Sequence, residues 1–415
     1  MSSVRILIVS QYFWPEGFRI NDIAKTLVEK GAHVDILTGK PNYPEGRIFA
    51  GFRAWGTQRE TWEGATVFRV PLFPRGAISN WRLALKYLSF IFSGLIFGPW
   101  LLRKRQYDVV FVYGLSPIML TIPGIFLSYL KRRNLVLWVQ DLWPDSLSAT
   151  GYILHPLFLR GLERIVRWIY DRSDLILAPS RSFIAEIAAL APGKTVTYYP
   201  NSVEATFGEP PDPRVVLPSV AALETGFPVV FAGNVGVAQA VEVIVEAAEL
   251  LKSYSDISFV VFGQGSRWEW MREQVAMRGL TNLHLPGRFP VVTMPGLLQK
   301  AGALLVTLAD ESIFAATVPN KIQAYMAAGR PILASLHGEG ARIVEEAQAG
   351  FSVPAEDAQA LANAVLRLYR MSPEQRVAMG ANGRRYFKTH FDHDKLVEEL
   401  MTHLIRMAVT NEEMA

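Results

Sequence analysis

The chain has 415 residues and a mass of 46.4 kDa, a length that suits two domains and excludes a single small binding module. Half of the residues are hydrophobic and 19% are charged, so neither a disordered nor a fibrous chain fits. The sequence contains no cysteine, which excludes disulfides, thiolate catalysis and zinc–thiolate or iron–sulfur sites.

Charge is distributed unevenly along the chain. Residues 1–200 contain 24 lysines and arginines against 14 aspartates and glutamates, whereas residues 201–415 contain 18 against 24. The basic first half indicates an anionic partner such as a membrane surface or a phosphate. We expect no nucleic acid as partner, because the basic segments lack the aromatic interleaving of nucleic-acid binders. The N-terminus shows no cleavable leader pattern, so we expect a cytoplasmic chain.

The first half of the chain predicts alternating strands and helices. Residues 4–10 form an apolar run, residues 20–28 repeat their apolar positions at helical spacing, and residues 33–38 predict the next strand. Five more apolar runs predict strands at residues 66–70, 109–113, 135–139, 175–178 and 195–199. Because most of them are separated by helix-length segments, we expect a parallel sheet covered on both faces.

A second series of strands follows the proline-rich segment 210–218. Its apolar runs lie at residues 229–232, 258–262, 303–308, 331–334 and 351–353. The expected fold class is therefore α/β, with two doubly wound domains joined near residues 205–220.

Two apolar segments, 83–102 and 115–130, are flanked by basic residues. Each is interrupted, at Lys86, Pro99, Pro117 and Pro123. Neither therefore offers about 20 unbroken apolar residues for a membrane span. We expect the second segment to be a buried helix. For the first, a buried helix and an interfacial helix on anionic lipid both remain open, because its apolar residues cover more than one core-facing stripe.

Two glycine turns follow the first two strands of the second domain. Residues 233–236 (Gly-Asn-Val-Gly) lead into a helix, and residues 263–267 (Gly-Gln-Gly-Ser-Arg) end the next strand. Such turns expose backbone N–H groups and a helix N-terminus to a phosphate, although glycines also serve ordinary tight turns. Parallel strands bring both turns to one edge of the sheet, which favours an anionic ligand there.

A lysine is predicted in the first turn of a later helix. Pro319 fits the beginning of that helix, Gly329 its end and Pro331 the next strand, so Lys321 lies near the helix N-terminus. A lysine there opposes the helix dipole. A bound diphosphate would make the position favourable, because its negative charge attracts both the lysine and the helix N-terminus.

Carboxylates follow two strands of the first domain. Asp141 comes directly after the strand at 135–139 and is placed to meet a hydroxyl, whereas Asp145 reads as a helix cap. The loop after the first strand combines four aromatic residues with Glu16 and Arg19. Both segments lie at the carboxyl edge of the expected sheet, where α/β proteins bind ligands.

Other catalytic patterns are absent from the sequence: a P-loop, a serine-hydrolase elbow, a zinc-protease helix motif and a dinucleotide fingerprint after the first strand. Two histidines and two aspartates near the C-terminus, residues 390–394, read as helix-cap residues rather than metal ligands. We therefore expect no metal site.

Six short motifs, taken together, resemble the landmarks of glycosyltransferase family 4. They lie in order along the chain at residues 10–16, 38–46, 141–145, 200–203, 231–236 and 319–329. More narrowly, they resemble the bacterial fucosamine transferases that assemble surface polysaccharides such as O-antigen. The resemblance implies a GT-B fold of two Rossmann-like domains facing across a cleft. It places a membrane-facing acceptor domain at 1–205, a nucleotide-sugar domain at 206–385 and a C-terminal helix, 386–415, returning toward the first domain.

The resemblance also implies a reaction. A retaining, metal-independent transfer without a cofactor would move an amino-deoxyhexose or hexosamine from a nucleoside diphosphate, expected to be UDP, to a lipid-linked saccharide or a polysaccharide. The enzyme would be peripheral, held at the cytoplasmic face of the plasma membrane by its basic first domain on anionic lipid. The expected catalytic residues are Asp141, Lys321 and Glu16. The donor and its diphosphate are expected to contact Gly17, Gly233, Asn234, Gly236, Gly265, Arg267, Lys321 and Gln323.

The sequence departs from the wider family where that family binds phosphate, ribose and donor sugar with charged residues. The four neutral positions are Asn234, Gln239, Ala316 and Ala324. We expect Lys321 to compensate in charge, and Glu311 or Gln323 in hydroxyl binding. Two alternatives remain: a catalytically silent GT-B subunit that binds nucleotide sugar or lipid in an assembly complex, and a nucleotide-sugar epimerase of similar fold.

Overall fold

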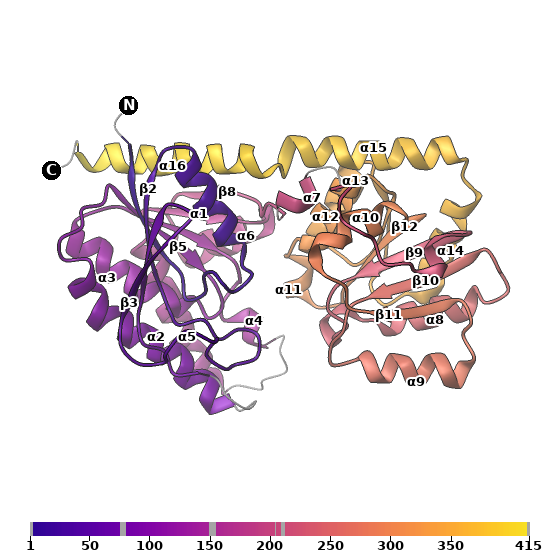
Figure 1. Cartoon of the computed structure of the whole chain (residues 1–415), viewed down its shortest axis with the longest axis horizontal. Helices are drawn as coiled ribbons and strands as arrows, with labels where there is room; N and C mark the ends of the chain where they lie inside the picture. The colour runs from indigo at the N-terminus through magenta and orange to yellow at the C-terminus, as the bar shows by residue number, and fades with distance from the viewer. Residues whose placement is uncertain (1–2, 75–79, 149–154, 204, 209–211, 413–415) are drawn as a thin grey trace. The chain divides into compact units, whose positions relative to one another are not determined.

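The computed structural model describes residues 3–74, 80–148, 155–203, 205–208 and 212–412 (Figure 1). The chain divides into two compact units. Unit 1 contains residues 1–200 and 394–415, and unit 2 contains residues 201–393. Each unit is built on its own sheet, so the prediction of two α/β domains is confirmed.

Unit 1 contains an eight-stranded sheet in the order β3-β4-β2-β1-β5-β6-β7-β8. Neighbouring strands are parallel except for the antiparallel pair β3–β4 at one edge. The strands are β1 (Arg5–Val9), β2 (His33–Thr38), β3 (Gln58–Trp62), β4 (Ala65–Arg69), β5 (Val109–Gly114), β6 (Leu135–Val139), β7 (Leu175–Ala178) and β8 (Val196–Tyr198). All the strands predicted for this half are present.

Helices cover both faces of this sheet. They are α1 (Arg19–Glu29), α2 (Asn80–Leu101), the 3-10 turn η1 (Ile118–Thr121), α3 (Ile122–Lys131), α4 (Asp145–Ser148), α5 (Pro156–Asp171), α6 (Arg181–Leu190) and α16 (His393–Glu412). Apolar side chains of α1 and α16 share one core with those of β1. The opposite face receives α2 and α3, where Gly98 adjoins Leu37 of β2 and Gly124 adjoins Val9 of β1.

The C-terminal helix α16 is an integral part of unit 1. The Tyr199 hydroxyl donates to the Leu396 carbonyl (2.9 Å), and the Asn134 side-chain amide donates to the Met407 carbonyl (2.8 Å). The preceding helix α15 (Pro373–His390) belongs to unit 2. The boundary expected at residue 386 therefore falls inside α15, and the chain passes between the units near residue 393.

Unit 2 contains a six-stranded, all-parallel sheet in the order β11-β10-β9-β12-β13-β14. Its strands are β9 (Phe227–Ala232), β10 (Ile257–Phe262), β11 (Leu283–Gly287), β12 (Ala303–Thr307), β13 (Ile332–Ser335) and β14 (Gly350–Val353). Its helices and 3-10 turns are α7 (Ala205–Gly208), η2 (Ala221–Leu223), η3 (Val237–Gln239), α8 (Glu242–Leu250), α9 (Trp268–Arg278), η4 (Val291–Thr293), α10 (Met294–Gln299), α11 (Ser312–Ala315), α12 (Asn320–Ala328), α13 (Glu339–Glu346), α14 (Ala358–Arg370) and α15.

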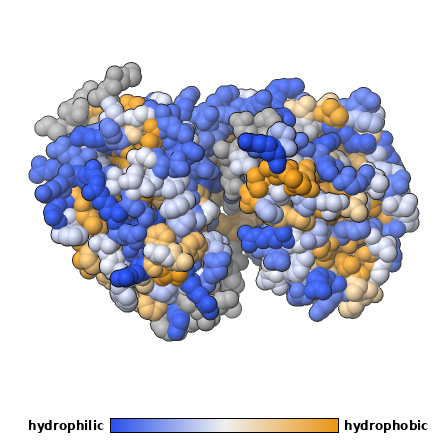
Figure 2. Space-filling view, in the orientation of Figure 1, coloured by the Kyte–Doolittle hydropathy of each residue, from blue (hydrophilic) through white to orange (hydrophobic). Residues whose placement is uncertain are grey.

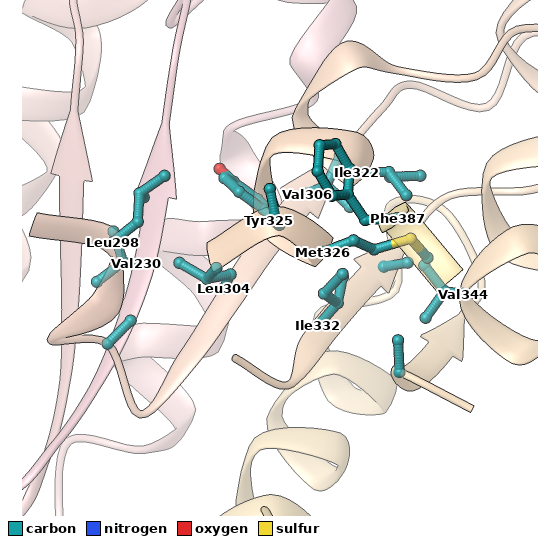
Figure 3. Close-up of a cluster of buried hydrophobic side chains, with 14 of the residues drawn as sticks. Val230, Leu298, Leu304, Val306, Ile322, Tyr325, Met326, Ile332, Val344 and Phe387 are labelled. Carbon is teal, nitrogen blue, oxygen red and sulfur yellow. The ribbon is translucent and has the colours of Figure 1, made fainter. Parts of the chain in front are cut away.

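Two apolar layers, one on each face of this sheet, form the core of unit 2. Alternating strand residues point to opposite faces, as in Val229 and Val230 of β9. On one face, Val230 lies in the layer that contains Ile322 and Met326 of α12, shown in Figure 3. This packing fixes α12 against the carboxyl half of the sheet, and with it the lysine near the helix N-terminus.

Candidate functional site

The two glycine turns of unit 2 pack against each other at the carboxyl ends of β9 and β10. The Gly233 amide donates to the Phe262 carbonyl (2.8 Å). Glycine is required in the second turn, because a Cβ on Gly263 (φ +144) would overlap the Gly233 carbonyl oxygen and one on Gly265 would overlap that of Val235. The prediction that both turns share one edge of the sheet is confirmed.

Lys321 lies directly on the first of these turns. A Cβ on Gly233 would be 2.9 Å from Lys321 Nζ, so the glycine leaves the space that the lysine occupies. Nζ lies 4.5 Å from the centroid of the Phe231 ring, and within the part of the chain that the structure describes it forms no hydrogen bond or ion pair. Burial lowers the pKa of Lys321 to about 8, because the ammonium loses water without gaining a carboxylate. An anionic ligand would supply the missing partner.

The N-terminus of α12 adds a second source of positive potential. Pro319 precedes this nine-residue helix without a side-chain cap, and Lys321 is the second residue of the helix. Tyr325, one turn later, holds the helix in place, because its hydroxyl accepts a hydrogen bond from the Ala232 amide at the end of β9 (2.9 Å). Tyr325 was not predicted as a site residue, although its spacing of four residues from Lys321 places both on one helix face.

Asn234, a predicted donor contact, binds Gln239, the other neutral residue of this turn where the wider family has a charged one. Asn234 Nδ2 donates to Gln239 Oε1 (3.1 Å), and Gly236 lies against the Asn234 amide. These side chains line the glycine turn without adding charge. Lys321 therefore supplies a full positive charge to a turn whose own side chains are neutral.

Arg267 has a different partner from the one expected. Its guanidinium pairs with Glu242 in the first turn of α8, with Nε 2.7 Å from the carboxylate oxygen, and lies 4.7 Å from the Trp270 ring centroid. The phosphate contact stays a prediction, and because the carboxylate already neutralises the guanidinium, a phosphate would have to displace it.

Gln323, another predicted donor contact, lies away from Lys321, and its side-chain amide forms no hydrogen bond among the described residues, so its contact with the donor stays a prediction. Gln323 is 1% exposed, so its side chain is closed to a ligand in this structure. The reason is helical geometry: at about 100° per residue, position 323 points roughly 200° away from position 321. Lys321 and Gln323 therefore lie on opposite sides of α12.

In unit 1, Asp141 follows β6 and forms part of a short hydrogen-bond network. Ser116 hydrogen-bonds to the Asp141 carboxylate, and the Trp143 indole N–H donates to the Ser116 hydroxyl (2.9 Å). Burial raises the pKa of Asp141 to about 6, against the opposing effect of the Ser116 bond. A carboxylate with this pKa is ionised at pH 7 and accepts a proton readily, which suits a general base. Ser116 was not predicted as a site residue, because it precedes Asp141 by 25 residues and no local motif joins the two.

Substituting Ser116 tests this network. We expect Ser116→Ala to raise the pKa of Asp141 above about 6, because the hydrogen bond that favours the ionised form is lost. The acid limb of the activity–pH profile should then move to higher pH. Ser128→Ala is a matched control, since Ser128 bonds to the Ile125 carbonyl in α3. An unmoved acid limb would show that Asp141 does not set it.

Glu16 has a structural role in this conformation. The residue is 2% exposed, and its carboxylate accepts hydrogen bonds from the backbone amides of Asn42 and Tyr43 (both 2.7 Å). Burial raises the pKa of Glu16, and these bonds oppose the rise. In this structure the carboxylate joins the loops that follow β1 and β2, and the contact of Glu16 with a substrate hydroxyl stays a prediction. Gly17, by contrast, is exposed, and a Cβ there would meet no heavy atom within 4 Å.

Known proteins resemble the chain in sequence and in fold. WbjE of Pseudomonas aeruginosa, named as a glycosyltransferase, is 29% identical over 299 residues, covering 71% of this chain and 74% of that protein. WcaI of Escherichia coli K12, named as a colanic acid biosynthesis glycosyl transferase, is 27% identical over 343 residues, covering 79% and 82%. The solved structure of Anabaena Alr3699/HepE in complex with UDP has a TM-score of 0.68 at 14% identity, covering 97% of this chain and 100% of that one.

The chain is a glycosyltransferase with the GT-B fold. Family models match in both units. Unit 1 matches the glycosyl transferase 4-like domain over residues 17–202, and unit 2 matches glycosyl transferases group 1 over residues 226–371.

Proposed function

We propose that this glycosyltransferase transfers an amino-deoxyhexose or hexosamine, with retention of anomeric configuration, from a UDP-linked donor to a lipid-linked saccharide or a polysaccharide. The observation that carries the proposal is the ammonium group of Lys321, which lies on the Gly233 turn at an uncapped helix N-terminus with no anionic partner among the described residues. A pyrophosphate is the part of such a donor that this arrangement suits.

In the proposed reaction, the bond between the sugar C1 and the diphosphate oxygen breaks, and a bond from C1 to the acceptor oxygen forms. The leaving diphosphate gains negative charge as the first bond lengthens. Lys321 and the positive end of α12 stabilise that charge more in the transition state than in the bound donor, and this difference accelerates the reaction.

The acceptor hydroxyl must also lose its proton. Asp141, with a pKa raised to about 6, is the proposed base, held in position by Ser116. The chain's own residues thus provide both charge stabilisation and proton transfer, and we propose that neither a metal nor a cofactor is needed.

Two comparisons support the proposed substrates. The Anabaena protein of similar fold was solved with UDP, and the E. coli relative is named for colanic acid biosynthesis. We propose by extension that the donor carries UDP, that the acceptor belongs to a surface polysaccharide such as O-antigen, and that the enzyme works peripherally at the cytoplasmic face of the plasma membrane. We also propose that, among glycosyltransferases, the protein belongs to the branch of the fucosamine transferases.

A silent binding subunit is a second candidate, favoured by one observation. The Gly233 turn carries neutral Asn234 and Gln239, and Arg267 is neutralised by Glu242, so Lys321 is left to provide charge at this turn. Such a site would still bind a nucleotide diphosphate but would stabilise the leaving group less.

Nucleotide release separates the two candidates. Purified protein is incubated with a panel of UDP-sugars, with and without a bacterial lipid extract, and free UDP is measured. Acceptor-dependent release, with a product of the donor's anomeric configuration by NMR, is the result that the transferase predicts. Binding of UDP without release across the panel favours the silent subunit, and isomerisation of the donor without acceptor would identify an epimerase. Failure to bind any nucleotide diphosphate would contradict the transferase, the epimerase and a subunit that binds nucleotide sugar.

A further inference from the structure

Helix α2 has two opposite apolar faces. Its inner face contains the buried Phe90, Gly94 and Gly98, and a Cβ on Gly94 would lie 2.8 Å from Pro123 of α3. Its outer face repeats every four residues and is exposed by 48% to 66%, at Leu88, Phe92, Ile96 and Trp100. A helix that only covers a sheet has a polar outer face, so the outer stripe of α2 requires another explanation.

Length and composition alone would let part of α2 cross a membrane. Within the described residues, the stretch Arg82–Leu101 passes that criterion, with a mean hydropathy of 1.3 and 28% of the residues buried. Its inner face is nevertheless fixed in unit 1, where buried Lys86 donates to the Tyr12 hydroxyl (2.7 Å). The structure therefore favours a helix that lies on a surface rather than one that leaves its domain.

Helix α5 continues the exposed apolar surface, which the sequence analysis did not anticipate. Its core face buries residues such as Val166 and Ile169, while its outer face exposes four large apolar residues by 40% to 66%: Leu157, Phe158, Ile165 and Trp168. Arginines stand between them, at Arg160, Arg164 and Arg167, and Arg172 follows the helix. Basic residues beside exposed tryptophan, phenylalanine and leucine are typical of interfacial helices.

Helix α3 adds to the same side of unit 1. It was expected to be buried, yet Phe126, Tyr129 and Leu130 are exposed by 40%, 84% and 50%. The helices α2, α3 and α5 all adjoin the turn η1, and they lie together in Figure 1. Figure 2 shows apolar residues among hydrophilic ones on the visible face of unit 1. We name the exposed residues of these three helices the α2–α3–α5 face.

The charge of this part of the chain selects the partner of the face. Residues 80–133, which contain α2 and α3, include eight lysines and arginines and a single acidic residue, Asp108. Of the eight, Lys86 is buried on the inner face and Arg105 pairs with Asp35, so the other six carry the positive charge. On α5, Arg167 is paired with Glu163, whereas Arg160 and Arg164 are exposed. A second copy of the chain, docked symmetrically, would bring these positive charges together. An anionic bilayer would attract them while accepting the apolar side chains.

We propose that the α2–α3–α5 face binds the surface of a bilayer that contains anionic lipid, with Phe92, Ile96 and Trp168 entering the interface and Arg160 and Arg164 contacting headgroups. This inference deepens the proposed function, since it assigns the membrane contact to particular helices. Vesicle binding requires neither donor nor acceptor. The membrane proposal can therefore fail while the protein binds nucleotide, and nucleotide binding can fail while the protein binds vesicles.

The test is co-sedimentation of the full chain with vesicles of phosphatidylcholine alone or with 30% phosphatidylglycerol. The wild type should bind the mixed vesicles and bind the neutral ones much more weakly. Arg160→Gln/Arg164→Gln should weaken binding to mixed vesicles roughly 10- to 30-fold, since each basic residue near such a surface contributes about fivefold. Phe92→Gln/Ile96→Gln should weaken it at every lipid composition.

A matched control removes two other charges of unit 1. Arg47 and Arg53 are exposed and lie outside the α2–α3–α5 face, so Arg47→Gln/Arg53→Gln should bind as the wild type does. Equal losses in both arginine pairs would show a general charge effect and overturn the assignment. Absence of wild-type binding to mixed vesicles would overturn it too, as would a dimer in sedimentation analysis that Phe92→Gln/Ile96→Gln dissociates. Circular dichroism and the melting temperature show that each variant is folded.

Discussion

Lys321→Met is expected to weaken UDP binding about 10- to 150-fold, the effect of losing a charged hydrogen bond of about 1.5–3 kcal/mol. The methionine keeps the length of the side chain and its packing on Phe231 but removes the ammonium. Isothermal titration calorimetry of wild type and variant measures the change. The melting temperature should stay the same or rise, because the substitution removes a desolvated charge that has no anionic partner among the described residues.

The effect should also depend on pH. The pKa of Lys321 in the folded protein is lowered to about 8, so the charged fraction falls as pH rises from 7 to 9. Wild-type affinity for UDP should fall over this range, whereas the affinity of Lys321→Met should follow the titration of the nucleotide alone. Lys300→Met is the matched control, because Lys300 pairs with Glu224 elsewhere in unit 2 (2.7 Å). Equal affinities in wild type and Lys321→Met would remove the lysine from the site.

Gly263→Ala is expected to destabilise the protein by about 2–4 kcal/mol and to abolish measurable UDP binding. The added Cβ would overlap the Gly233 carbonyl oxygen, and the backbone at Gly263 has a φ of +144°, which alanine rarely adopts. The two turns must then separate, which moves Gly233 from its place beside Lys321. Thermal unfolding and calorimetry check the two parts of this prediction.

A substitution at a second glycine, Gly287, distinguishes the effect of backbone strain from the effect of contact between the two turns. Gly287 also has a positive φ, +89°, but a Cβ there would meet no heavy atom within 4 Å. Gly287→Ala should lower the free energy of unfolding by about 1–2 kcal/mol, and the variant should still bind UDP. If Gly263→Ala has no greater effect than Gly287→Ala, contact between the turns does not hold the site together.

Most of the fold could be predicted because its strands are buried on both faces and therefore form continuous apolar runs. Two strands were missed for the same reason. β3 has the polar sequence QRETW and lies at a sheet edge, and β11 contains a proline and also lies at an edge. Both strands alternate between exposed and partly buried residues, so their sequences carry no such run.

The site could be predicted only in part. The glycine turns and Lys321 are local features of the sequence, and the structure brings them together. The Arg267–Glu242 pair is tertiary, since it joins the N-terminal regions of two helices 25 residues apart, so spacing alone gave no sign of it. Gln323 lies on the side of α12 opposite Lys321, as a spacing of two residues on a helix requires. The outer face of α5 was visible in the sequence as arginines between large apolar residues, and it was overlooked because the segment is too polar to suggest a membrane helix.

The most direct test of the account is the affinity of the wild-type protein for UDP compared with UMP, measured by calorimetry at pH 7. If Lys321 and the N-terminus of α12 bind the second phosphate, UDP should bind at least tenfold more tightly than UMP. In Lys321→Met, this difference in affinity should be largely lost. Equal binding of the two nucleotides by the wild type would contradict the assignment of this turn and its lysine to the leaving group.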